Sequence, residues 1–272
     1  MIRLAVRVPR ADAETVLAEL LALAPGGLEE RDLGDSVEYA IYGAPGELPA
    51  LPELRAAAGD ALVDVASSEV PDDWAERWKA FHRPVDVSWR LRRLRVRPPC
   101  EAPLEGDGID IVIDPGQAFG TGAHHTTRLC LELLLELEPT GPLADWGCGS
   151  GVLAIAAARL GWSPVMACDS DPASVEATRA NAAVNGAPGI DVTRVDLRRS
   201  EGPPAPTVVA NLVRPLLLEI AGRMTRPPER LIVSGLLRDE GDEVSDAFSR
   251  HGLREAGRRN AAEWTALLLA NG

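Results

Sequence analysis

Three glycines and an aspartate near the middle of the chain have the spacing of a ligand-binding loop. Gly147, Gly149 and Gly151 alternate in the run DWGCGSG, where a predicted strand turns into a predicted helix. Glycine permits a tight backbone bend and lets a ligand approach bare main chain. Asp169 ends the next predicted strand, where a carboxylate can bind both ribose hydroxyls of a nucleoside. This pattern predicts a site for a nucleoside-containing cofactor.

The loop also fits a dinucleotide pattern, so two cofactors compete for it. The run GSGVLA matches G-x-G-x-x-A, and Asp169 follows Gly149 by twenty residues. Asp145, however, precedes the first glycine by two, and its carboxylate would repel a pyrophosphate. It can instead orient backbone amides or meet an ammonium group. We therefore predict S-adenosylmethionine as the cofactor, with NAD and a nicotinamide-dependent oxidoreductase as the distant alternative.

Two polar residues follow later strands of the same predicted sheet. Asp196 ends the third strand, where it can bind the adenine amino group or cap the next turn, two interpretations of equal weight. Asn211 ends the fourth strand and faces the crevice at the carboxyl ends of the strands, where its carbonyl can hold an amine N–H. The following residues, LVR, lack the ring that stacks on planar amides or bases. Asn211 is the predicted catalytic residue and a tetrahedral amine the predicted substrate; a turn or helix-cap asparagine is the alternative.

A segment rich in glycine, threonine and histidine, IDPGQAFGTGAHHTT, covers residues 113–127. Its paired histidines, His124 and His125, suggest a metal site. Adjacent side chains on a strand point apart, and no third or fourth ligand is spaced to join them. We therefore predict that the chain binds no metal here. A Ser-His-Asp hydrolase is also unsupported, because the chain has no G-x-S-x-G motif.

The elements that must position these residues fall into two regions. The first has the order β-α-β-β-α-β of a ferredoxin-like α+β unit, with strands at 2–8, 28–33, 36–42 and 61–67 and helices at 11–24 and 50–58. A helix near 71–81 with an aromatic stripe, and strand-like runs at 85–97 and 109–113, connect it to the second region.

From residue 128 onward, strands alternate with helices, which implies an α/β fold with a largely parallel sheet covered on both faces. The strands are predicted at 143–146, 164–169, 191–196, 207–211 and 230–234, and the helices at 128–138, 151–160, 172–185, 213–225 and 239–250. Two final strands near 253–258 and 264–270 have no helix between them and predict an antiparallel hairpin at the sheet edge. That arrangement is the seven-stranded, Rossmann-like sheet of S-adenosylmethionine-dependent methyltransferases.

Composition limits the remaining function classes. The net charge of −13 argues against direct nucleic-acid binding and suits a basic partner. The arginine-rich run 90–97 alternates like a strand with a solvated basic face rather than an RNA-binding patch. No apolar run is long enough to cross a membrane, the N-terminus lacks a signal-peptide core, and the four cysteines form no CxxC pair. These features predict a cytoplasmic protein with reduced thiols.

Several motifs, in order, resemble those of the PrmA family, bacterial enzymes that methylate the eleventh protein of the large ribosomal subunit on lysine side chains and its N-terminal amine. The motifs are PDDWAERWKAFHRPV, DPGQAFGTGAHHTTRLCL, DWGCGSGVLAIAAARLG, CDSDPASVEATRANAAVNG, VVANLV and SGLLRDE. The resemblance covers roughly residues 70–272, and the first 65 residues match in layout more than in letters. Two positions depart from it: Pro206 replaces an aspartate, and Pro98-Pro99-Cys100 replaces a Pro-x-Trp context.

The resemblance implies roles for individual residues. The residues expected to contact the cofactor or the reaction centre are Thr127, Gly147, Asp169 and Asn211. The residues expected to line the pocket wall are Phe119, His124 and Thr126. Thr126 and Thr127 are expected to offer their hydroxyls to the methionine part of the cofactor. His125 is expected on the surface. The implied domains are a substrate-recognition unit at 1–68 that binds a basic, lysine-bearing ribosomal protein, a linker helix at 69–84 and a methyltransferase domain at 85–272. Methylation of another protein's lysines or of a small-molecule amine is the alternative.

Overall fold

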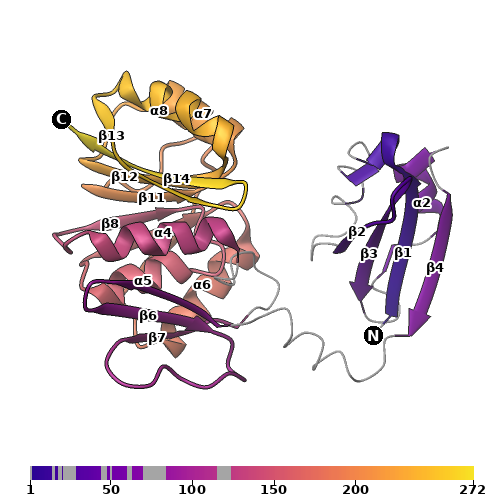
Figure 1. Ribbon diagram of the computed structural model, residues 1–272, viewed down its shortest axis with the longest axis horizontal. Helices are drawn as coiled ribbons and strands as arrows, with labels where there is room; N and C mark the ends of the chain where they lie inside the picture. Colours follow the sequence, from indigo (N-terminus) through magenta and orange to yellow (C-terminus); the bar gives the residue numbers. More distant parts are fainter. Residues whose placement is uncertain are drawn as a thin grey trace. The chain divides into compact units, whose positions relative to one another are not determined.

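The computed structural model describes residues 2–13, 16–17, 20, 29–43, 48–49, 51–59, 63–69, 84–114 and 124–272. The chain divides into two compact units, Met1–Ala80 and Phe81–Gly272, which are described separately (Figure 1). Most of the predicted linker helix at 69–84, with its aromatic stripe, lies outside the described residues, and so does Phe119. Among the described residues, no helix combines the length and apolarity needed to span a bilayer.

The first unit contains a four-stranded antiparallel sheet in the order β2-β3-β1-β4. Its elements are β1 (Ile2–Pro9), η1 (Arg10–Asp12), β2 (Glu29–Asp32), β3 (Ser36–Gly43), α2 (Leu51–Ala58) and β4 (Asp64–Glu69). Alternate apolar residues of β1 and β3 form its core with Leu20 and Leu54. The strands lie close to their predicted positions. The ferredoxin-like assignment stays a prediction, because the first of its two helices is only partly described.

The second unit begins with a three-stranded sheet, β5 (Val85–Trp89), β6 (Arg92–Arg97) and β7 (Ile109–Val112), in that order. The strand-like run predicted over 85–97 is divided into two strands, because the chain reverses at Arg90 and Leu91 and pairs β5 antiparallel with β6. Arg90 adopts a left-handed φ of 53°, which is uncommon for a residue other than glycine. The turn therefore carries no glycine or proline signal.

A seven-stranded mixed sheet follows, in the order β10-β9-β8-β11-β12-β14-β13. Five strands are parallel, and β14 pairs antiparallel with both β12 and β13, so the closing hairpin is present. The strands are β8 (Leu143–Trp146), β9 (Val165–Asp169), β10 (Asp191–Arg194), β11 (Thr207–Asn211), β12 (Arg230–Leu237), β13 (Leu253–Ala261) and β14 (Trp264–Asn271). The helices are α4 (His125–Glu136), α5 (Val152–Leu160), α6 (Pro172–Val184), α7 (Arg214–Arg223) and α8 (Gly241–Ser249), with the short η3 (Arg238–Glu240).

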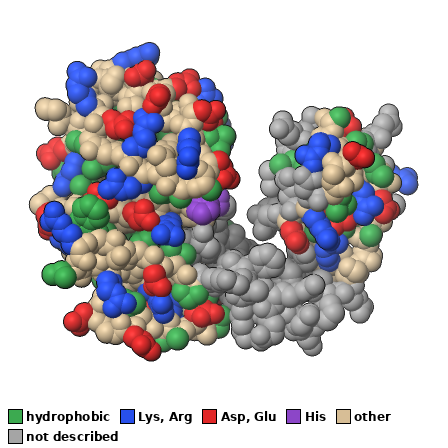
Figure 2. All heavy atoms as spheres, viewed as in Figure 1, with side chains coloured by type: hydrophobic (Ala, Val, Ile, Leu, Met, Phe, Trp, Pro, Cys, Tyr) green, Lys and Arg blue, Asp and Glu red, His purple; other side chains and the backbone are tan. Residues whose placement is uncertain are grey.

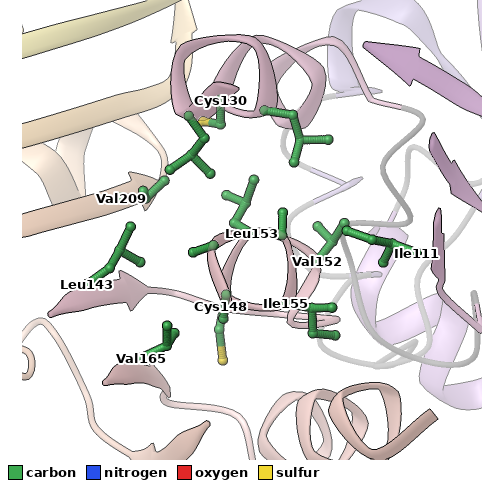
Figure 3. Packing of buried hydrophobic residues seen from close by; sticks show 14 of the residues in the cluster. Ile111, Cys130, Leu143, Cys148, Val152, Leu153, Ile155, Val165 and Val209 are labelled. Atoms are coloured by element: carbon green, nitrogen blue, oxygen red, sulfur yellow. The ribbon is translucent and has the colours of Figure 1, made fainter. Parts of the chain in front are cut away.

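Two hydrophobic cores lie on opposite faces of this sheet. Along β11, Val209 belongs to a core with α4, α5 and α6, whereas Val208 and Ala210 belong to a core with α7 and α8. Successive strand residues point to opposite faces, so the helices cover both sides of the sheet. The first core also takes in the small sheet through Ile111, which packs near Val152 of α5 (Figure 3).

Arginines of β6 alternate with the buried Leu94 and Val96, as predicted, and several of them form ion pairs. Arg95 pairs with Asp86 at 2.8 Å and Arg97 with Asp110 at 2.8 Å, while Arg92 donates to the carbonyl of Leu137 near the end of α4. Positive and negative side chains are interspersed over the visible face of the second unit (Figure 2). The first two contacts join β6 to its neighbouring strands β5 and β7, and the third attaches the small sheet to the end of α4.

Candidate functional site

The glycine loop joins β8 to α5, as predicted, and its three glycines all have a left-handed φ, 76°, 52° and 82° in chain order. A Cβ on Gly147 would lie 2.3 Å from Cδ2 of Leu212. A Cβ on Gly151 would lie 2.7 Å from Cγ2 of Thr178. Both the backbone conformation and the close approach of neighbouring segments therefore require glycine at these positions.

Asp169 is the half-buried last residue of β9 and is tied to the glycine loop. Its Oδ2 accepts a hydrogen bond from the amide of Gly149 at 3.0 Å, and its Oδ1 accepts one from the amide of Asp171 at 3.0 Å. An ionised carboxylate has about four lone-pair sites. The side chain therefore keeps acceptor capacity for a ligand after binding these two amides.

Asp145 lies beneath the loop and is fully buried. Its Oδ2 accepts a hydrogen bond from the amide of Ala154 in α5 at 3.0 Å, whereas Oδ1 has no hydrogen-bond partner within the described chain. Burial raises the pKa of this carboxyl to about 7; the negative charge of Asp169 adds to the rise, and the bond from Ala154 opposes it. The structure shows one predicted role, the orientation of a backbone amide, and exposes no surface of Asp145 to a ligand.

Asn211 meets Thr127 although 84 residues separate them in the chain. Asn211 ends β11, and its Nδ2 donates to Oγ1 of Thr127 at 3.3 Å. Thr127 is buried in the first turn of α4, because that helix begins at His125, three residues before the predicted start. With its nitrogen turned to Thr127, the amide offers its carbonyl oxygen as the acceptor for a ligand.

His124 precedes α4 and accepts a hydrogen bond from the amide of Thr126 on its Nδ1, at 3.4 Å. The Thr126 hydroxyl also lies 2.8 Å from this nitrogen. The His124 ring stands edge-on to Trp264 of β14, with ring centroids 4.9 Å apart. Burial, followed by repulsion from His125, lowers the pKa of His124, which Glu263 partly offsets. His124 is therefore a neutral, half-buried ring, whereas His125 is exposed.

Asp196 was predicted to end the third strand of the sheet. That prediction was wrong, because β10 stops at Arg194. Its Oδ1 accepts a hydrogen bond from the amide of Arg198 at 3.0 Å, and its Oδ2 lies 3.4 Å from Nε of Arg199. The turn-capping interpretation is thus present in the structure. Contact with adenine stays a prediction.

Sequence reasoning missed two residues that contact neighbours of the site residues, one beside His124 and one beside Leu212. Trp264, from the C-terminal hairpin, contacts His124 as described above. Gly235 of β12 has a φ of 85°, and a Cβ there would lie 2.4 Å from the carbonyl oxygen of Leu212. Leu212 is therefore fixed between Gly147 and Gly235. The signal was a glycine inside a strand pattern, SGLL, which indicates a bulge or a close backbone approach.

The chain is similar in sequence and in fold to known proteins. Residues 53–271 match the model of the family "Ribosomal protein L11 methyltransferase (PrmA)". A protein of that name from Symbiobacterium thermophilum is 41% identical over 72% of this chain, a match that spans 65% of its own length. One from Myxococcus xanthus is 34% identical over 97% of this chain and 96% of its own. The crystal structure of a ribosomal protein L11 methylase from Lactobacillus delbrueckii subsp. bulgaricus matches with a TM-score of 0.58 and 26% identity, over 68% of this chain and 98% of that one. The chain belongs to the ribosomal protein L11 methyltransferase (PrmA) family.

Proposed function

We propose that this protein is an S-adenosylmethionine-dependent methyltransferase that methylates amines of ribosomal protein L11, on lysine side chains and on its N-terminal amine. Membership of the family supports the reaction and the substrate protein. The observation that carries the proposal is the hydrogen bond from Asn211 to Thr127. It fixes an amide at the carboxyl end of a central strand, beside the strand that leads into the glycine loop.

The residues of the loop fit S-adenosylmethionine. Gly147 and Gly151 leave bare main chain where a side chain would collide with Leu212 or Thr178. Asp169 keeps acceptor capacity for ribose hydroxyls after it has bound the amides of Gly149 and Asp171. When bound, S-adenosylmethionine supplies a methyl group that its sulfonium already activates.

The protein's own task is then to hold a neutral amine in line and to exclude water. A lysine ammonium has an ordinary pKa of about 10.4 and must lose its proton first. A desolvated position beside a positive charge favours that loss. Asn211 accepts the N–H of the neutral amine through Oδ1 and aims the nitrogen lone pair, and the neutral His124 ring lines the same site. We assign no general base.

The division of the chain supports separate roles for its parts. We propose that residues 1–68 recognise the ribosomal protein, that residues 69–84 link the two parts, and that residues 85–272 bind the cofactor and carry out the transfer. The boundary between the two compact units, after Ala80, falls inside the proposed linker, which supports a recognition part and a transfer part. The net charge of −13 for the whole chain suits a substrate protein that is basic.

Transfer of a labelled methyl group from S-adenosylmethionine to purified L11 tests the proposal. Asn211→Ala is expected to lower kcat by about 10²-fold, because it removes the group that aligns the amine, while cofactor affinity by calorimetry stays within about threefold. Asn260→Ala, which changes an exposed asparagine of β13, is the matched control. An Asn211→Ala protein with the full rate would exclude the catalytic role. Equal rates on free amines and on L11 would exclude the protein substrate, and binding of NAD in place of S-adenosylmethionine would exclude the reaction class.

A further inference from the structure

Two asparagines, Asn181 of α6 and Asn185, which caps the C-terminus of that helix, are almost completely buried. They are one helical turn apart, and each residue is 5% exposed. Buried amides are stable in a protein interior only when their hydrogen-bonding groups find partners. Their hydrogen-bond partners lie at the edge of β7 and in the glycine loop.

The first set of partners is the free edge of β7, the outer strand of the sheet β5-β6-β7. Ile113 donates its amide towards β6, to the carbonyl of Arg97 at 2.9 Å, so the amides of Val112 and Asp114 point the other way. Asn185 accepts from the Val112 amide at 2.7 Å and donates to the Val112 carbonyl at 2.6 Å. Asn181 accepts from the Asp114 amide at 3.3 Å.

The spacing explains why a helix can pair with this edge. Four residues of helix rise about 6 Å, and two residues of strand rise about 6.6 Å. Two amide side chains at i and i+4 therefore meet two successive outward-facing peptide groups of the strand. The asparagines occupy the position of a missing strand and supply partners for the peptide groups of Val112 and for the amide of Asp114.

The two asparagines differ in their remaining bonds. Nδ2 of Asn185 donates to the carbonyl of Asn181 within the same helix, at 2.8 Å. Nδ2 of Asn181 instead donates to the carbonyl of Ser150 in the glycine loop, at 2.9 Å. One turn earlier, Thr178 donates its hydroxyl to the carbonyl of Gly149 at 2.9 Å. Consecutive carbonyls of the loop are thus held by one face of α6.

We propose that Asn181 is a positioning residue for cofactor binding. Its side chain ties the glycine loop to Asp114, which is the last described residue before the segment that leads to His124. The inference rests on the proposed function, since its ligand is S-adenosylmethionine. Loss of Asn181 removes one hydrogen bond from the Ser150 carbonyl and one from the Asp114 amide, while Thr178 still holds Gly149. The loop then loses its fixed conformation, and part of the binding free energy is spent on restoring it.

Asn181→Leu and Asn185→Leu are matched variants, compared for the dissociation constant of S-adenosylmethionine by calorimetry and for melting temperature. Asn185 makes three side-chain hydrogen bonds and Asn181 two, so Asn185→Leu is expected to lower the melting temperature at least as much. Asn181→Leu is expected to weaken binding at least tenfold, and Asn185→Leu less than twofold. Equal changes in affinity, or an unchanged affinity in Asn181→Leu, would overturn the inference.

Amide hydrogen exchange of the wild-type protein provides a second measurement that does not depend on variants that fold. Addition of S-adenosylmethionine is expected to slow exchange at Asp114, through Asn181, and to leave Val112, held by Asn185, unchanged. The coupling would be contradicted if S-adenosylmethionine left exchange at the Asp114 amide unchanged, or if it slowed exchange equally at Asp114 and Val112. A wild-type protein that binds no S-adenosylmethionine would instead refute the proposed function, so the two failures are distinguishable.

Discussion

The buried carboxyl of Asp145 makes the stability of the protein depend on pH in a way that one substitution removes. The side chain is completely buried, and its Oδ1 lacks a hydrogen-bond partner among the described residues. Burial raises its pKa from the ordinary 3.8 to about 7. Asp145→Asn keeps an oxygen that can accept a hydrogen bond from the amide of Ala154, and the new side chain cannot ionise.

The sign follows from proton binding in the two states. Between pH 4 and pH 7 the folded protein holds a proton on Asp145 that the unfolded chain has already released. The free energy of unfolding therefore falls as pH rises through this window, by about 1.4 kcal/mol per pH unit. Over the whole window, from 3.8 to about 7, the loss is about 4 kcal/mol. Above pH 7 the Asp145 contribution no longer changes.

Urea unfolding at pH 5.5 and pH 8.0 measures this effect. The wild-type protein is expected to lose about 2 kcal/mol more than Asp145→Asn between these two pH values, because about 1.5 pH units of the window lie between them. Asp191→Asn, which removes the charge of an exposed aspartate of β10, controls for the change in net charge and is expected to parallel the wild type. Parallel pH dependences for the wild type and Asp145→Asn would refute the conclusion that burial keeps this carboxyl protonated.

Three further substitutions test the site. Gly151→Ala forces a side chain into a left-handed φ of 82° and against Thr178, so it is expected to lower the free energy of unfolding by at least about 1 kcal/mol in urea titrations; a neutral result would contradict the requirement for glycine. Thr127→Val removes the acceptor for Asn211 and is expected to lower kcat about tenfold in the methyl-transfer assay, with Thr127→Ser close to wild type; equal losses in both would point to packing instead. Trp264→Leu opens the surroundings of His124, so the pKa of His124, which burial lowers, is expected to rise in an NMR titration. An unchanged pKa would show that the Trp264 ring does not shield His124.

Local sequence signals predicted the parts of the site that depend on neighbouring residues. The alternation of glycines in DWGCGSG placed the loop between β8 and α5, because only glycine accepts three left-handed conformations in five residues. The hairpin at 85–97 was not predicted, because its turn contains no local signal of this kind. Arg90 makes the turn without glycine or proline, and the period-two pattern of arginines continues through it.

Contacts between distant segments could not be derived from local patterns. The bond between Asn211 and Thr127 joins a strand end to a helix start 84 residues earlier, and only the family resemblance suggested that both residues lie at one site. The amides of Asn181 and Asn185 show the limit most directly. A polar pair at i and i+4 usually marks the solvent face of a helix, and here it faces a strand edge.

The same contacts imply that the glycine loop is shaped by the fold before any ligand binds. Leu212 packs against the loop at Gly147, and α6 packs against it at Gly151. The side chains of Asp169, Thr178 and Asn181 bind the Gly149 amide, the Gly149 carbonyl and the Ser150 carbonyl, respectively. A loop held in this way loses little conformational entropy on binding, so more of the interaction free energy appears as affinity. Substitutions in α6 that contact no ligand should therefore weaken binding, whereas equally buried positions without a bond to the loop should change stability alone.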